Sequence, residues 1–172
     1  GDGEDTVSDT GGSDTIRFGD GISPDDIQFL RPSGYPAEDN LEIRIKGTND
    51  KITVSDYFTN YTNMSKENTG AIERFEFSDG TVLTTRDVID QVRIRHGSSS
   101  NDYLSGLSDA DNTLYGDAGN DELLGRYGND TLIGDQGTDR LDGGAGDDTY
   151  IFNKGDGEDY IIDIDGEADK VR

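Results

Sequence analysis

The sequence predicts an all-β-dominated protein in which a parallel β-roll, a solenoid of short stacked strands, follows a small β-rich domain with one or two short helices. Three observations carry this prediction. Residues 97–151 divide into consecutive units of about nine residues, residues 17–95 contain strands of alternating apolar and polar side chains, and the 172-residue chain has 24 glycines but only 3 prolines. Together they indicate one repetitive unit and one globular unit.

The composition excludes several kinds of chemistry. There is no cysteine, so disulfides, thiolate metal sites and cysteine nucleophiles are absent, and His96 is the single histidine on which any imidazole-based catalysis would depend. We therefore expect no enzymatic activity. The net charge of −23 would repel nucleic acids and anionic lipids, and no apolar stretch is long enough to span a membrane. We expect no nucleic-acid partner, no membrane insertion, and cations as the natural ligands.

Four consecutive nonapeptides, which begin at Gly116, Gly125, Gly134 and Gly143, keep the same phase. Glycine recurs at places one and four, aspartate at place six and a large apolar residue at place eight. Because glycine permits left-handed or tightly bent backbone, the first six places predict a turn and the last three a short strand with its middle side chain pointing inward. Two units then make one coil of 18 residues, so each turn stacks on the turn two units away.

Stacked turns of this kind bring carboxylate and carbonyl oxygens face to face, which suits a hard cation. Ca²⁺ takes about 6 to 8 oxygen ligands in flexible geometry, whereas Mg²⁺ demands a stricter octahedron, so we predict Ca²⁺, with about five ions. The candidate ligands are turn positions and aspartates of the repeats, together with two aspartates near the N-terminus: Asp102, Gly116, Ala118, Gly119, Asp121, Gly125, Tyr127, Gly128, Asp130, Gly134, Gln136, Gly137, Asp139, Gly143, Ala145, Gly146, Asp148, Asp159, Asp5 and Asp14.

Two units depart from the pattern. The unit at Gly106 carries an insertion that places Asp111 and Asn112 where one aspartate is expected, and the unit at Gly97 has serine at place four. We expect sites that use those turns to be weaker or empty. After Ile151 the phase slips by two residues, and a further turn ends at Asp159.

A longer period is also present. Gly1-Asp2-Gly3-Glu4-Asp5 recurs as residues 155–159, and Asp14-Thr15-Ile16-Arg17 is echoed by residues 169–172. We interpret the chain as one period of a tandem array plus the opening of the next, so adjoining blocks of the same polypeptide are expected neighbours. The predicted boundaries are 1–18 for the end of a preceding block, 19–95 for the globular domain and 96–172 for the roll.

Within the globular domain, local signals place the elements. Ser23-Pro24-Asp25-Asp26 predicts one helical turn before a strand at 27–30, and alternation predicts strands at 41–46 and 74–77. Residues 47–50 form a turn before a further strand at 52–54. Thr84-Thr85-Arg86-Asp87 resembles a capping box that begins a helix ending near Val92.

The nonapeptides resemble those of the RTX family of secreted proteins, in which such repeats form a parallel β-roll around calcium. The segments 19–27, 41–48, 52–58 and 75–81 resemble the haemolysin-type calcium-binding related domain found between RTX blocks, most closely in iron-regulated and pore-forming RTX toxins. The resemblance implies a non-catalytic, calcium-binding block of a large bacterial protein that leaves the cell through type I secretion machinery. It further implies extracellular folding on Ca²⁺, which supports secretion and folding of the parent toxin.

Two alternatives remain open from the sequence. One is an adhesive or ligand-binding module in which calcium is only structural. The other is an accessory domain of a secreted hydrolase.

Overall fold

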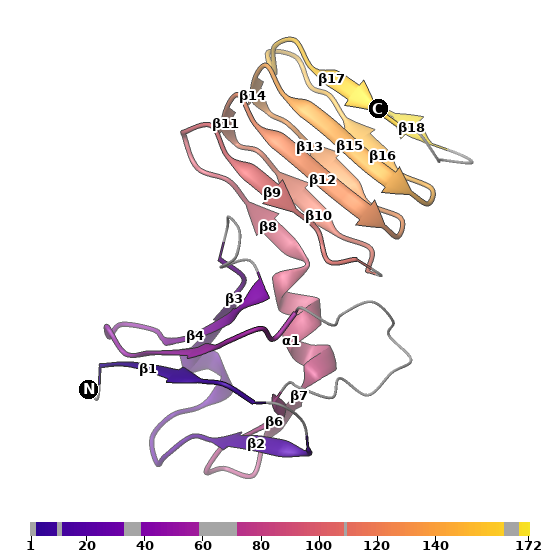
Figure 1. Cartoon of the computed structure of the whole chain (residues 1–172). Coiled ribbons are helices and arrows are strands. Elements are labelled where there is room, and N and C mark those ends of the chain that lie inside the picture. The colour runs from indigo at the N-terminus through magenta and orange to yellow at the C-terminus, as the bar shows by residue number, and fades with distance from the viewer. Residues whose placement is uncertain (1–2, 10–11, 33–38, 59–71, 109, 164–168) are drawn as a thin grey trace. The chain divides into compact units, whose positions relative to one another are not determined.

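The computed structural model describes residues 3–9, 12–32, 39–58, 72–108, 110–163 and 169–172 (Figure 1). The chain divides into two compact units, residues 1–92 and residues 93–172. Arg93, Ile94 and Arg95, which the sequence interpretation assigned to the globular domain, therefore belong to the second unit. Within the described ranges, no helix has the length and apolar character needed to cross a membrane.

The described residues of the first unit form two sheets and two short helices. One sheet has the order β1-β5-β4-β3 and the other the order β2-β6-β7, and in each the first pair is parallel and the remaining pairs are antiparallel. The elements are β1 (Glu4–Val7), β2 (Asp14–Arg17), η1 (Pro24–Asp26), β3 (Ile27–Leu30), β4 (Leu41–Ile45), β5 (Lys51–Val54), β6 (Ile72–Glu76), β7 (Val82–Thr84) and α1 (Thr85–Val92). The predicted helical turn, the strands near 27–30, 41–46, 52–54 and 74–77 and the helix that ends at Val92 are present, and β7 is a strand that the sequence analysis did not predict.

Capping side chains start both helices as the sequence predicts. The Ser23 backbone N–H donates to Asp26 Oδ2 at 2.9 Å, and the Thr84 N–H donates to Asp87 Oδ2 at 2.8 Å. Each bond satisfies an N–H at the helix start that has no partner within the helix. The helix α1 then buries Val88, Ile89 and Val92 in the core, which fixes this unit around an apolar centre.

The second unit is a parallel β-roll with two sheets (Figure 1). One sheet contains β8 (Ile94–His96), β10 (Thr113–Tyr115), β13 (Thr131–Ile133), β16 (Thr149–Ile151) and β18 (Lys170–Val171). The other contains β9 (Tyr103–Ser105), β12 (Glu122–Tyr127), β15 (Arg140–Ala145) and β17 (Tyr160–Ile162), and the turns contribute the short pair β11 (Ala118–Gly119) and β14 (Gln136–Gly137). The predicted all-β fold and the parallel roll are confirmed.

The register of the roll follows the repeat. Leu114 pairs with Leu132, and Leu123 pairs with Leu141, so neighbouring strands come from alternate nonapeptides. The place-eight side chains form one buried column between the sheets, which consists of Leu104, Leu114, Leu123, Leu132, Leu141 and Tyr150. Burial of a leucine side chain contributes about 1.5 to 3 kcal/mol, so this column stabilises a roll that has little other apolar material.

Two features of the turns differ from the sequence expectation. The strands β12 and β15 are six residues long and continue into the first places of the next unit. Left-handed backbone occurs at places two and four and not at the place-one glycines: Asp117, Arg126, Asp135 and Gly144 at place two have φ between 60° and 93°. The place-one glycines are therefore required for a reason other than backbone conformation.

Candidate metal centre

The place-six aspartates form two ladders along the roll. In each ladder the Oδ1 of one aspartate accepts the backbone N–H of the place-six residue one coil earlier. The bonds are Asp102 N to Asp121 Oδ1 (2.8 Å), Asp121 N to Asp139 Oδ1 (2.7 Å), Asp139 N to Asp159 Oδ1 (3.1 Å), Asn112 N to Asp130 Oδ1 (2.6 Å), Asp130 N to Asp148 Oδ1 (2.8 Å) and Asp148 N to Asp169 Oδ1 (2.9 Å). The ladders fix where each carboxylate points.

The second oxygen of five of these carboxylates is buried without a donor. Oδ2 of Asp121, Asp130, Asp139, Asp148 and Asp159 has no hydrogen-bond partner. Asp121, Asp130, Asp139 and Asp148 are at most 3% exposed, so water does not satisfy their charge. A buried charged group without a partner is costly unless a counter-charge accompanies it.

Burial raises the pKa of these groups. Loss of hydration is the main cause, and it raises the pKa of Asp130 to about 7 and that of Asp139 to about 6, against an ordinary value of 3.8. The pKa values of Asp121 and Asp148 are raised for the same reason. The fold without a cation thus favours protonated carboxyls, which indicates that positive charge is missing from the turns.

The place-one glycines leave space for oxygens to converge. A Cβ at Gly116 would lie 2.6 Å from Asp121 Oδ2 and 2.6 Å from the Gly134 carbonyl oxygen. A Cβ at Gly125 would meet Asp130 Oδ2 and the Gly143 carbonyl oxygen in the same way. The turns that begin at Gly116 and Gly125 therefore each contain a small cradle in which a carboxylate and a carbonyl of the next coil approach one point.

Three place-two residues other than glycine adopt left-handed backbone. Arg126, with φ of 86°, has a backbone conformation that costs of order 1 to 3 kcal/mol for a residue other than glycine. Asp117 and Asp135 share this conformation at the same place of their units. Its recurrence at one place of the repeat indicates that the turn geometry requires it. The sequence-based ligand set did not include the place-two residues.

Asn112 shows which oxygens surround the centre of a turn. Its Nδ2 donates to the carbonyl oxygens of Leu107 (3.0 Å), Ala110 (2.7 Å) and Gly125 (3.3 Å) and to Asp130 Oδ1 (2.9 Å). Asn112 is 2% exposed. One buried amide nitrogen thus faces four oxygens. The oxygens of Leu107 and Ala110 belong to its own turn, at the positions equivalent to places two and four, and those of Gly125 and Asp130 belong to places one and six of the next coil. In the first turn of the roll the Ser98 hydroxyl donates to Asp102 Oδ2 (2.8 Å), whereas the five Oδ2 atoms named above have no such donor.

A parallel ladder of place-five side chains holds the turns together from outside. Oδ1 of Asn101 accepts the Asn120 N–H (2.9 Å), and Oδ1 of Asn120 accepts the Thr138 N–H (3.0 Å). Asn129 likewise accepts the Asp147 N–H (2.8 Å). These residues are exposed, and the recurrence of asparagine before the place-six aspartate was the signal that could have identified them.

The last coil adds a group of three acidic residues. Asp148, Asp163 and Asp169 each place one carboxylate oxygen within 4.8 Å of the others. The Tyr150 hydroxyl accepts the Gly143 N–H (2.9 Å) and donates to Asp163 Oδ2 (2.9 Å), so the one place-eight tyrosine in this column positions Asp163. Asp163 lies outside the repeat phase and was missing from the predicted set.

The predicted ligand residues fall into four groups. The aspartates from Asp102 to Asp159 lie in the ladders, and the glycines at places one and four line the turns. The place-three residues Ala118 and Gln136 pair with one another across the turn, as Tyr127 and Ala145 do. Asp5 and Asp14 belong to the first unit, where Asp5 is exposed on β1.

Two further residues bear on these predictions. Asp9 lies beside Asp14 and raises the pKa of the Asp14 carboxyl. His96 is outside the ladders and stacks on the Tyr115 ring at 4.3 Å between ring centroids.

Comparison with known families bears directly on this centre. The model of the RTX calcium-binding nonapeptide repeat (4 copies) matches residues 96–126, 115–150 and 124–161, and the model of the haemolysin-type calcium binding protein related domain matches residues 40–87. The chain belongs to the RTX family of calcium-binding repeat proteins. No curated protein matches the chain significantly. This RTX repeat protein binds Ca²⁺ through its repeats, a class of β-solenoid that is typically structural and non-catalytic and typical of secreted bacterial proteins.

Proposed function

We propose that this RTX block is a calcium-triggered folding module of a large bacterial protein exported by a type I secretion system. Low calcium inside the cell would keep the block unfolded for transport, and higher calcium outside would fold it and so support folding of the parent toxin. The observation that carries the proposal is the set of five buried Oδ2 atoms without donors, because such a fold is incomplete without positive charge.

The oxygens present suit Ca²⁺. Around Asp130 the ligand set, by analogy with the neighbours of Asn112, is the carbonyls of Arg126, Gly128 and Gly143 and the carboxylates of Asp130 and Asp148. These are all hard oxygen donors, both neutral and charged, which is the donor class that Ca²⁺ prefers. Bound Ca²⁺ supplies the positive charge that the turns lack.

The charge balance supports a switch rather than a permanent fold. Residues 96–172 carry 19 acidic and 5 basic side chains, a net charge of −14. The apolar column of the roll is one side chain wide, so little hydrophobic energy opposes this repulsion. Folding free energy must therefore come largely from the ions, since a site that exists only in the folded chain couples binding to folding.

Far-ultraviolet circular dichroism during a Ca²⁺ titration tests the proposal, with Mg²⁺ as a second titrant. We expect a cooperative gain of β signal with Ca²⁺ and little with Mg²⁺. The double variant Asp121→Ala/Asp130→Ala should need much more Ca²⁺, because it removes one carboxylate from each ladder. The control Asp20→Ala/Asp25→Ala removes the same charge from exposed positions outside the repeats and should titrate like the wild type.

A chain that is fully folded in chelator would overturn the proposal. It would shift the function to the adhesive alternative, in which calcium is only structural. An equal response to Mg²⁺ would also contradict the ligand argument, because Mg²⁺ retains its water in a loose cage of this kind.

A further inference from the structure

The same coil sequence occurs twice in this chain, and the two copies have different partners. Residues 1–5 repeat as 155–159, and residues 14–17 are echoed by 169–172. The first copy forms β1 and β2, which pair in parallel with β5 and β6. The second copy forms β17 and β18, which pair in parallel with β15 and β16.

The two copies of the first strand use opposite edges. Along β17, the N–H groups of Glu158 and Tyr160 donate to Gly137 O (3.2 Å) and Asp139 O (2.7 Å). Backbone groups alternate in direction along a strand, so Gly157, Asp159 and Ile161 direct theirs to the other edge. The counterparts of Gly157 and Ile161, which are Gly3 and Val7, accept from Lys51 N (3.1 Å) and Ser55 N (2.9 Å) of the β5 segment.

The two copies of the second strand, β2 and β18, also use opposite edges. Along β18, the N–H groups of Lys170 and Arg172 donate to Asp148 O (3.0 Å) and Tyr150 O (3.0 Å), which leaves the groups of Val171 on the outer edge. Val171 corresponds to Ile16, and Ile16 lies opposite Phe75 in the β2–β6 pair. Thus β6 pairs with the edge of the first copy that remains exposed in the second.

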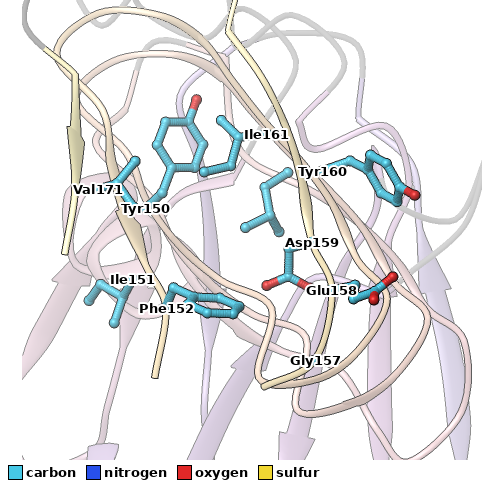
Figure 2. A pocket seen from close by; sticks show the side chains of 10 residues that line it. Tyr150, Ile151, Phe152, Gly157, Glu158, Asp159, Tyr160, Ile161 and Val171 are labelled. Carbon is cyan, nitrogen blue, oxygen red and sulfur yellow. The ribbon is translucent and has the colours of Figure 1, made fainter. Parts of the chain in front are cut away.

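The outer edge of β17 and β18 is also apolar. Phe152, Ile161 and Val171 are 47%, 40% and 66% exposed, and they border a groove of about 460 Å³ that Tyr150 and Ile151 also line (Figure 2). The counterparts of Ile161 and Val171 in the first unit, Val7 and Ile16, are half-buried. Open strand edges with exposed apolar side chains associate readily with further strands.

We propose that β17 and β18 are the docking edge for a second domain of the residue 18–92 type. The counterparts of β5 and β6 would add in parallel, with the counterparts of Lys51 and Ser55 donating to Gly157 O and Ile161 O. The counterpart of Asp50 would accept the Gly157 N–H, as Asp50 Oδ1 accepts the Gly3 N–H at 3.3 Å. The coil is therefore a shared element between a roll and the domain that follows it.

A tandem chain tests this proposal: the complete 172 residues followed directly by a second copy of residues 18–92. Amide hydrogen exchange by NMR is compared with that of the 172-residue chain, both at saturating Ca²⁺, so the result does not depend on whether calcium triggers folding. We expect the Ile161 and Val171 amides to exchange about 100-fold more slowly in the tandem chain, because only there do they gain protection. Unchanged exchange of both amides, or an unfolded second copy, would overturn the proposal.

Two edge variants sharpen the test. Ile161→Pro removes an N–H that faces the outer edge, and Val171→Lys places a charge there; both should leave the 172-residue chain folded and abolish docking in the tandem chain. Tyr160→Pro is the matched control, because it removes the N–H that bonds Asp139 O and should damage the last coil in both chains. Retained protection in the tandem form of Val171→Lys would refute the assigned edge.

Discussion

Asn112→Asp should convert a turn that holds itself together into one that requires an additional Ca²⁺. The wild-type amide nitrogen donates to three carbonyls and to Asp130 Oδ1, and the aspartate loses all four bonds. The amide has two N–H groups, so these four contacts amount to about two full hydrogen bonds; at about 1 kcal/mol for a bond to a carbonyl and about 2 for the bond to the carboxylate, the loss is about 3 kcal/mol. The new carboxylate also faces that of Asp130.

The effect on a calcium titration follows from linkage. A loss of about 3 kcal/mol, shared over about five ions, raises the Ca²⁺ concentration at the folding midpoint by about threefold. At saturating Ca²⁺ the additional ion offsets the loss. We therefore expect the variant to bind one more Ca²⁺ per chain, measured by elemental analysis after gel filtration, and to recover most of its stability to urea.

Asn120→Asp is the matched control for this prediction. It makes the same chemical change at an exposed place-five position and keeps the oxygen that accepts the Thr138 N–H. Its ion count and titration midpoint should stay close to those of the wild type. If Asn112→Asp binds no additional ion and is destabilised equally at low and saturating Ca²⁺, the idea that the amide replaces a cation is wrong.

Three other perturbations test the roll. The raised pKa values of Asp130 and Asp139 mean that the ion-free fold binds protons more tightly than the unfolded chain, so its stability in chelator falls as pH rises toward about 6 to 7. Because the unfolded chain and the Ca²⁺-bound fold are both ionised above pH 6, the Ca²⁺ concentration at the folding midpoint should stay level or rise from pH 6 to pH 8, and a midpoint that falls over this range in circular dichroism would contradict this. Gly125→Ala should raise the Ca²⁺ midpoint, because its Cβ would lie 2.5 Å from the Gly143 carbonyl oxygen, whereas Gly19→Ala, with no atom within 4 Å of its Cβ, should not. Leu132→Ala should lower the free energy of unfolding, measured with urea at saturating Ca²⁺, by about 2 to 5 kcal/mol. Tyr127→Ala changes an exposed side chain and should lower it by less than about 0.5 kcal/mol. Equal losses in the two variants would show that the leucine column is not the core.

The repeat could be predicted because its information is local. Glycine, aspartate and leucine at fixed places set the turn, the ladder and the core column, and parallel stacking follows from the 18-residue coil. The start of the roll was harder to place because Arg95 occupies the position opposite Leu114, where the pattern calls for an apolar side chain. Arg95 is 7% exposed, and its guanidinium donates to Ser105 O at 2.8 Å, a compensation that only the folded chain reveals.

The details of the site depended on contacts between turns. Arg126 gives no sign in the sequence that it adopts left-handed backbone, since its side chain has no preference for that region. Asn112 can be identified as a departure from the repeat, but the four oxygens around its amide come from two different coils. Asp163 is held by Tyr150 across 13 residues outside the repeat phase. Tertiary contacts of this kind leave no local pattern.

The ladder bonds have a consequence for how such chains can change in length. Successive place-six partners are 18 residues apart in the regular coils, but 19 at Asp102, 20 at Asp139 and 21 at Asp148. The bonds persist at all of these spacings, so one to three additional residues are absorbed within a coil without disturbing the aspartates. Short insertions, whether natural or introduced as peptide tags, should therefore be tolerated outside the three strand places of each unit. A single-residue insertion within those strand places would instead turn the core leucine toward solvent.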